Sequence, residues 1–286
     1  MTGSRTRAAG RLARRTPPTS DPARRRGAPL FIALPAAVGL AFLVLPLVAL
    51  LVRAPWRGLP HVLADSQVLT ALRLSLECAT AATAVSLVLG VPLAWVLARS
   101  RFPGLGLVRA FVTLPLVLPP VVGGLALLLA FGRNGIVGRY LNEWFGIALP
   151  FTTPGVIVAE TFVAMPFLII TVEGALRSAD LGLEEAATTL GASRVIVFRR
   201  ITLPLIGPSL LAGSVLCWAR ALGEFGATIT FAGNFPGTTQ TMPLAVYNAL
   251  ETDPEAAVAL SLVLLVVAVV ILALLRERWL RGGWSA

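Results

Sequence analysis

Six long apolar stretches, separated by short polar segments, dominate the pattern of residues along this chain. An α-helix needs about 20 consecutive apolar residues to cross the hydrocarbon core of a bilayer. The pattern therefore predicts an all-α integral membrane protein. The second stretch is longer than a bilayer requires, so we expect it to tilt or to emerge on one side. The six predicted transmembrane helices cover residues 30–52, 70–98, 107–131, 154–176, 209–231 and 256–275.

The composition agrees with a lipid environment. Of the 286 residues, 56% are hydrophobic and only 13% are charged, whereas charged residues make up about 25% of a typical soluble domain. The outer loops, at 53–69, 132–153 and 232–255, are short, and none could fold into a ligand-capturing domain of its own. Tight capture of a substrate, if it occurs, therefore requires a separate extracytoplasmic protein.

All 24 basic residues are arginines, and lysine is absent. A Walker A phosphate-binding loop depends on its lysine, and a catalytic lysine Schiff base is excluded for the same reason. If this chain works in an ATP-driven machine, another chain must hydrolyse the ATP. The net charge of +10 could suggest a nucleic-acid partner, but the positions of the arginines give a different explanation.

The arginines gather on one side of the predicted topology. With six spans both termini share a side, and 18 of the 24 arginines fall in the terminal segments and in the loops at 99–109 and 177–208. Loops rich in arginine remain in the cytoplasm. We therefore expect both termini and the 177–208 loop to be cytoplasmic, and no nucleic-acid partner is required. The opposite side carries only Arg53, Arg57, Arg133 and Arg139.

The two ends of the chain are expected to lie outside the membrane. Residues 1–29 are rich in arginine and proline and lack the apolar residues of a core, so they are predicted to form a disordered basic cytoplasmic tail. A signal peptide is the alternative, but the stretch at 30–52 is too long for its apolar region and no clear cleavage site follows. The transmembrane domain is then residues 30–276, followed by a cytoplasmic C-terminal tail at 277–286.

The polar loop at 177–208 is unlike the apolar stretches on either side of it. Asp180 is placed to cap a short helix, and Gly191 stands where a left-handed residue would end that helix. Ser193 could open a second helix, which is amphipathic because apolar residues alternate with three arginines. Two short helices joined at a glycine and lying at the membrane surface suit a docking element.

This loop resembles the "EAA…G………I-LP" signature of ATP-binding-cassette importer permeases, with every signature position filled. The alternative is a generic amphipathic cytoplasmic loop. The resemblance implies the type I importer permease fold, in which the loop forms coupling helices that seat in a cleft of the cytoplasmic ATPase. It also implies a pathway formed by two copies of this chain, two ATPase subunits and an extracytoplasmic binding protein. The residues implied to couple to the ATPase are Glu185, Ala186, Ala187, Gly191, Ile201, Leu203 and Pro204.

Further segments resemble the molybdate permeases within that family, and together the likeness covers residues 30–276. They are ETFVAMP at 160–166, RALGEFGAT at 220–228 and TQTMPLA at 239–245. Sulfate permeases are similar around residues 220–234, so sulfate or thiosulfate is the alternative cargo. The resemblance therefore implies import of molybdate or of the near-isosteric tungstate, with the binding protein making most of the selection.

Charged residues inside the predicted spans are costly to bury and usually face a bundle interior or a water-filled path. Arg220 and Glu224 are four residues apart on one helix face, near mid-membrane, and can pair. Arg220 either guides an oxyanion or forms an interior ion pair that fixes helix packing, and the neighbouring Glu224 favours the second. In the third span, Pro119 and Pro120 interrupt helix hydrogen bonding, which produces either a gate beside the pathway or a structural kink.

Three other classes of protein fit less well. An ion-coupled secondary carrier would need paired acidic residues or an ion site at the bilayer centre, and only Glu224 lies deep. An intramembrane enzyme is disfavoured because the HExxH and GxSxG motifs are absent. His61 has no metal-type neighbour, and Cys78 and Cys217 lie in apolar runs, so neither a metal site, a cofactor nor a disulfide is predicted. A scaffold without transport activity is disfavoured by the complete coupling signature.

Overall fold

The computed structural model describes residues 30–282, and in this range the secondary structure is helical throughout. The predicted tail at 1–29 lies outside the described residues. The chain divides into two units, residues 1–49 and 50–286, which are described separately. Helix α1, Leu30–Arg53, is apolar along its whole length and long enough to cross a membrane, as the first apolar stretch predicts.

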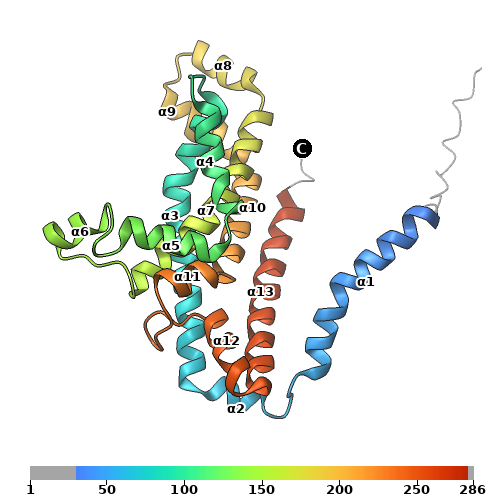
Figure 1. The fold of residues 1–286 in the computed structure, drawn as a ribbon. Helices are drawn as coiled ribbons and strands as arrows, with labels where there is room; N and C mark the ends of the chain where they lie inside the picture. The colour runs from blue at the N-terminus through green and yellow to red at the C-terminus, as the bar shows by residue number, and fades with distance from the viewer. Residues whose placement is uncertain (1–29, 283–286) are drawn as a thin grey trace, which may run out of the picture. The chain divides into compact units, whose positions relative to one another are not determined.

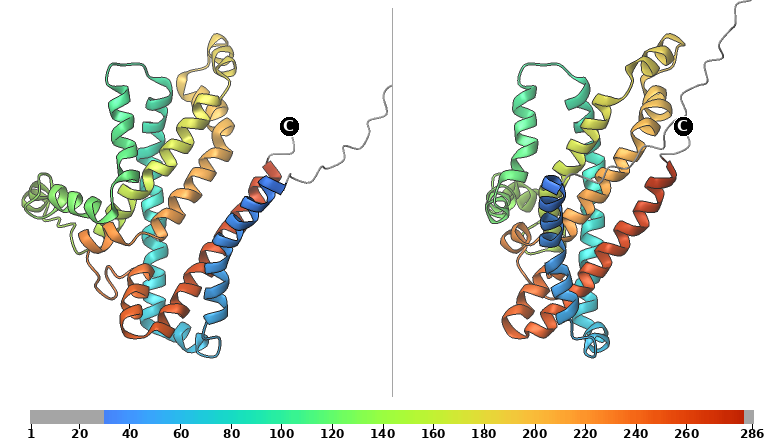
Figure 2. Two further views of the ribbon diagram at one scale, coloured as in Figure 1. Left: turned by 45° about the vertical axis from the view of Figure 1, so that its right-hand side comes forward. Right: turned by 90° about the vertical axis from the view of Figure 1, so that its right-hand side faces the viewer.

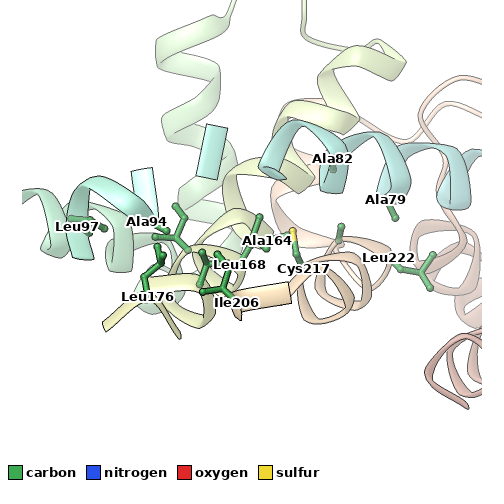
Figure 3. Close-up of a cluster of buried hydrophobic side chains, with 13 residues drawn as sticks. Ala79, Ala82, Ala94, Leu97, Ala164, Leu168, Leu176, Ile206, Cys217 and Leu222 are labelled. Carbon is green, nitrogen blue, oxygen red and sulfur yellow. The ribbon is translucent and has the colours of Figure 1, made fainter. Parts of the chain in front are cut away.

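Three long helices form the centre of the second unit: α3 (Ser66–Arg99), α7 (Thr153–Ser178) and α10 (Leu203–Leu222). They lie side by side, with α7 in contact with both of the others (Figures 1 and 2). Small residues let their backbones approach closely, which is how helices associate in lipid. The buried side chains between them are shown in Figure 3 and include Ala79, Ala82, Ala94, Leu97, Ala164, Leu168, Leu176, Ile206, Cys217 and Leu222.

Shorter helices complete this unit, and three of them lie in segments that the apolar pattern treats as loops. These are α2 (Leu59–Ala64), α6 (Gly138–Phe145) and α12 (Met242–Thr252). Helices of this length have too few residues to produce a long apolar stretch, so a search for spans misses them. Helix α13, Pro254–Gly282, packs against α12, and its apolar part at 254–271 corresponds to the sixth predicted span.

The third predicted span, 107–131, is interrupted at Pro119–Pro120, where the sequence predicts a gate or a kink. Helix α4 (Leu105–Val117) and helix α5 (Pro120–Phe131) are bent by 120° relative to each other. The break has a local cause, because Leu118 and Pro119 each precede a proline and are extended, with ψ of 135° and 132°. The described residues therefore hold five helices that could each cross a membrane, and the bent pair is a broken sixth span or a re-entrant loop.

The fifth span also differs from its prediction of 209–231. Helix α10 ends at Leu222, and a separate short helix, α11, covers Gly226–Phe231. Helix α11 packs against α5, so the segments beyond the two breaks lie together (Figure 1). At its other end the helix is longer than predicted, because it continues from residue 194 without a bend.

Candidate functional site

The first helix of the 177–208 loop forms as the sequence predicts. Helix α8 covers Leu181–Thr189, and the Asp180 carboxylate caps it by accepting a hydrogen bond from the Gly182 amide at 2.9 Å. At the other end Gly191 is left-handed, with φ of +86°. The amides of Gly191 and Ala192 donate to the carbonyls of Thr188 and Ala187, both at 3.0 Å. This is a Schellman ending, which a glycine at that position permits.

The second half of the loop differs from the prediction of a separate short helix. Helix α9 (Arg194–Val197) continues through one π-helical turn, η1 (Phe198–Thr202), directly into α10. Pro204 has no amide hydrogen, so the backbone hydrogen bond that residue 204 would donate in a regular α-helix is missing. A π-helical turn is a known way for a helix to continue past such a missing bond. Ser193 does stand at the helix start, but its side chain makes no capping bond.

The structure places the signature residues in two groups at one end of the bundle (Figure 1). The first group lies on α8 and its ending, where Glu185, Ala186 and Gly191 are exposed and Ala187 is half-buried. The second group lies in the helix that leads into the bundle, where Ile201 and Leu203 are half-buried and Pro204 is exposed. Two apolar residues close in sequence to the first group are also exposed: Leu190 is 87% exposed and Val195 is 65% exposed.

A half-buried ionic link attaches α8 to the bundle. The Glu184 Oε1 accepts hydrogen bonds from Arg99 Nη2 at 2.8 Å and from Thr202 Oγ1 at 3.0 Å. Arg99 is the last residue of α3, and Thr202 is the last residue before α10. Arg99 and Glu184 are 85 positions apart, so no local pattern in the sequence reveals the pair.

A second ionic cluster lies at the end of α3. The Glu173 Oε1 accepts from Arg109 Nη2 at 2.9 Å and from Arg177 Nε at 3.0 Å. Both arginines also donate to the Leu97 carbonyl at 3.3 Å. This cluster joins α3, α4 and α7, and it satisfies one of the free carbonyls at a helix end. Only the Glu173–Arg177 pair, which is four residues apart, could be anticipated from spacing.

The predicted Arg220–Glu224 pair forms at the break between α10 and α11, with Arg220 Nη2 2.6 Å from Glu224 Oε2. The side chain of Glu224 is 1% exposed and that of Arg220 is 29% exposed. The other oxygen, Glu224 Oε1, accepts a hydrogen bond from the Ala227 amide at 2.8 Å. Glu224 therefore neutralises Arg220 and also caps the first turn of α11.

The two breaks touch each other, which brings the predicted pathway residues together. A Cβ atom added at Gly226 would lie 2.7 Å from Pro120 Cβ and 3.3 Å from the Val121 amide nitrogen. Only glycine fits at this distance. Pro119 and Pro120 are exposed at the turn, so the proline break and the Arg220–Glu224 pair belong to one junction formed by α5, α10 and α11.

An open, largely apolar groove of about 560 Å³ lies beside this junction. Helices α10, α12 and α13 line it, and Phe225 stacks obliquely on Tyr247 with 5.2 Å between ring centroids. Helix α12 is not one of the candidate spans. A hydrogen bond to Glu251 raises the pKa of Tyr247, so its phenol is neutral near pH 7 and adds no charge to the groove.

The sequence pattern of the family described as "Binding-protein-dependent transport system inner membrane component" matches residues 86–282, well over half of the chain. The chain belongs to this family. It is therefore a permease of the inner membrane, a transport subunit and not an enzyme. The matched range includes both ionic clusters, the 177–208 loop and the junction of the two breaks.

Relatives of this permease cover most of its length. The molybdenum transport system permease protein of Mycobacterium bovis is 51% identical over 243 residues, covering 85% of this chain and 92% of the relative. The sulfate transport system permease protein of Salmonella typhimurium is 39% identical over 234 residues, covering 80% of this chain and 84% of the relative.

A solved structure shows that the fold is also shared. It is a bacterial alginate ABC transporter in complex with an alginate pentasaccharide-bound periplasmic protein. It matches with a TM-score of 0.68 and 21% identity, covering 90% of this chain and 95% of the other. The permease thus has the fold of ATP-binding-cassette importer permeases, as the signature loop implies.

Proposed function

We propose that this permease forms the membrane pathway of an ATP-driven importer whose cargo is molybdate, with tungstate as a near-isosteric second cargo. The observation that carries the proposal is the 51% identity to a molybdenum transport permease over nearly its whole length. Sulfate or thiosulfate is the second candidate, because a sulfate permease is 39% identical. The higher identity favours molybdate.

The partners that we propose are a second copy of this permease, two ATPase subunits and an extracytoplasmic oxyanion-binding protein. The family description names dependence on a binding protein, and the alginate transporter of the same fold was solved with its periplasmic protein. Because this chain contains no lysine, it has no Walker A loop of its own. A separate ATPase subunit must supply the energy.

In this mechanism α8 docks on the ATPase subunit. ATP binding closes the ATPase pair, and α8 carries that movement into the permease, which turns from inward-facing to outward-facing and receives the anion. Hydrolysis then resets the cycle. The exposed Glu185, Ala186 and Leu190 supply the docking surface, and the caps at Asp180 and Gly191 keep the helix rigid. Ile201, Leu203 and Pro204 lie where the loop continues into α10.

The coupling-loop end of the bundle is proposed to face the cytoplasm, together with both termini. Seven arginines of the described residues support this orientation, because the turn between α3 and α4 and the α8 loop lie at the same end (Figures 1 and 2). Cytoplasmic segments carry such an excess of arginine. The seven are Arg99, Arg101, Arg109, Arg177, Arg194, Arg199 and Arg200.

Uptake of labelled anions tests the cargo directly. We expect proteoliposomes that contain the permease, its ATPase and its binding protein to take up molybdate only with internal ATP. Excess tungstate should suppress that uptake strongly, and excess sulfate should have little effect. Sulfate uptake with indifference to molybdate would establish the second candidate. Uptake that persists without the ATPase would instead indicate an ion-coupled carrier.

A further inference from the structure

Helix α8 needs a side-chain link to move together with the bundle. None of its nine residues is fully buried, and a free helix of this length is marginally stable in water. Its backbone reaches the bundle through two short connections, one at Asp180 and one at Gly191–Ser193. Such connections bend under load, so a displacement imposed on α8 would be lost unless other contacts carry it inward.

Glu184 provides such a contact. One of its oxygens accepts from Arg99 and from Thr202 at 2.8 Å and 3.0 Å. The side chains of Arg99 and Glu184 are only 13% and 19% exposed, and Thr202 is buried. Shelter from water makes this charge-assisted pair stronger than an ion pair at the surface.

The two partners of Glu184 belong to different long helices. Arg99 ends α3 and Thr202 immediately precedes α10, and both helices pack along α7. The end of α3 is held in turn by Arg109 and Arg177, which donate to Leu97 and share Glu173. A movement of α8 is therefore applied through Glu184 to all three central helices.

We propose that Glu184 is the positioning residue that transmits the movement of α8 into α3 and α10. The inference rests on the proposed function, because it assumes that an ATPase moves α8, and it names the internal link that this function requires. The neighbouring residues Glu185 and Glu184 then have different roles in the same helix. The exposed Glu185 faces the partner surface, while Glu184 ties the helix to the bundle.

The test measures molybdate taken up per ATP hydrolysed by the complete transporter in proteoliposomes. For Glu184→Ala we expect this ratio to fall about tenfold, which is a typical coupling between sites, while the ATPase still copurifies and hydrolyses ATP. Arg99→Ala should lower the ratio by less, because Thr202 still donates to Glu184. The double variant should be no worse than Glu184→Ala alone, because the two side chains form one link.

Two further variants keep the test independent of folding. Glu184→Gln retains an acceptor oxygen, so its ratio should fall by only about threefold, as a neutral bond is roughly half as strong. The exchange Glu184→Arg with Arg99→Glu should recover part of the ratio lost in the single variants. The matched control is Glu77→Ala. It breaks the exposed Arg73–Glu77 pair on α3, the helix that ends at Arg99, and it should leave the ratio unchanged.

Several outcomes would overturn the inference. An assembled Glu184→Ala transporter with an unchanged ratio excludes transmission through this residue. Loss of ATPase copurification in Glu184→Gln would assign the residue to docking instead, and fully additive effects of Glu184→Ala and Arg99→Ala would exclude a single link. If the wild-type complex imports no oxyanion at all, the proposed function fails and the inference fails with it.

Discussion

The carboxylate of Glu224 has two partners, one on each side of the break between α10 and α11. One oxygen pairs with Arg220 and the other accepts from the Ala227 amide. Both contacts hold the break in shape, and neither leaves the arginine free to attract an anion. At the residue scale, the geometry supports a packing role for Arg220 over a role as an anion guide.

The variant Arg220→Gln separates these two roles. Because it leaves a buried carboxylate without its cation, we expect it to destabilise the permease by about 3 kcal/mol. The double variant Arg220→Gln with Glu224→Gln should recover most of that loss, since no unpaired charge remains. The measurement is thermal unfolding of the detergent-purified transporter, alongside the KM for molybdate uptake. A stable Arg220→Gln transporter with a much higher KM would favour the anion guide.

Residues whose partners are close in sequence are the ones that sequence reasoning could find. The Asp180 cap, the left-handed Gly191 and the Arg220–Glu224 pair depend on spacings of two to five positions, and all three form. The Arg99–Glu184 pair joins segments 85 positions apart. Such a pair depends on how helices pack, and a single sequence contains no direct sign of it.

At the scale of elements, the apolar stretches predict the long straight helices α3 and α7 well, because length and apolarity alone define a span. The same criterion fails at the two breaks. Both breaks lie inside long apolar stretches, so the apolar pattern alone does not show that the backbone turns at Pro119–Pro120 and at Gly223. The prolines did indicate a bend, but the local pattern does not give its angle of 120° or show that α5 then packs closely on α11 at Gly226.

The rigid ending of α8 leads to a prediction for Gly191→Val. A β-branched residue at φ of +86° is strained by roughly 1–3 kcal/mol, so the helix end should fray. We expect molybdate uptake per ATP hydrolysed to fall about tenfold, with the ATPase still active. The matched control is Gly174→Val on α7, where an added Cβ atom meets no atom within 4 Å. Normal coupled uptake by Gly191→Val would count against α8 as the lever.

At the scale of the whole molecule, the two ends of the second unit differ in charge. The end with α8 carries the arginine-rich turns, and the end with α2 and α12 lies opposite along α3 (Figure 1). An acidic pocket lined by Asp65, Glu251 and Asp253 lies at that second end. The excess of arginine at the α8 end supports our proposal that α8 is cytoplasmic.

Cysteine labelling of the permease expressed alone checks this orientation. The native Cys78 and Cys217 are fully buried and should react slowly. We expect Thr188→Cys on α8 to react with a membrane-impermeant maleimide in inside-out vesicles only, because this end faces the cytoplasm. Thr252→Cys on α12 should react in right-side-out vesicles only. The reverse pattern would place α8 outside the cell, where no ATPase could reach it.

The pairing of Arg220 with Glu224 has a consequence for the transport of anions. A doubly charged ion passing the junction of the two breaks would meet a cation whose field is already cancelled at 2.6 Å. A conduit must hold its ions loosely if they are to leave it, and an arginine paired in this way would hold an anion only weakly. The transport rate would then depend on how often the binding protein delivers an anion to the outer side of the permease. Substrate selectivity would lie in that binding protein and not in the membrane pathway.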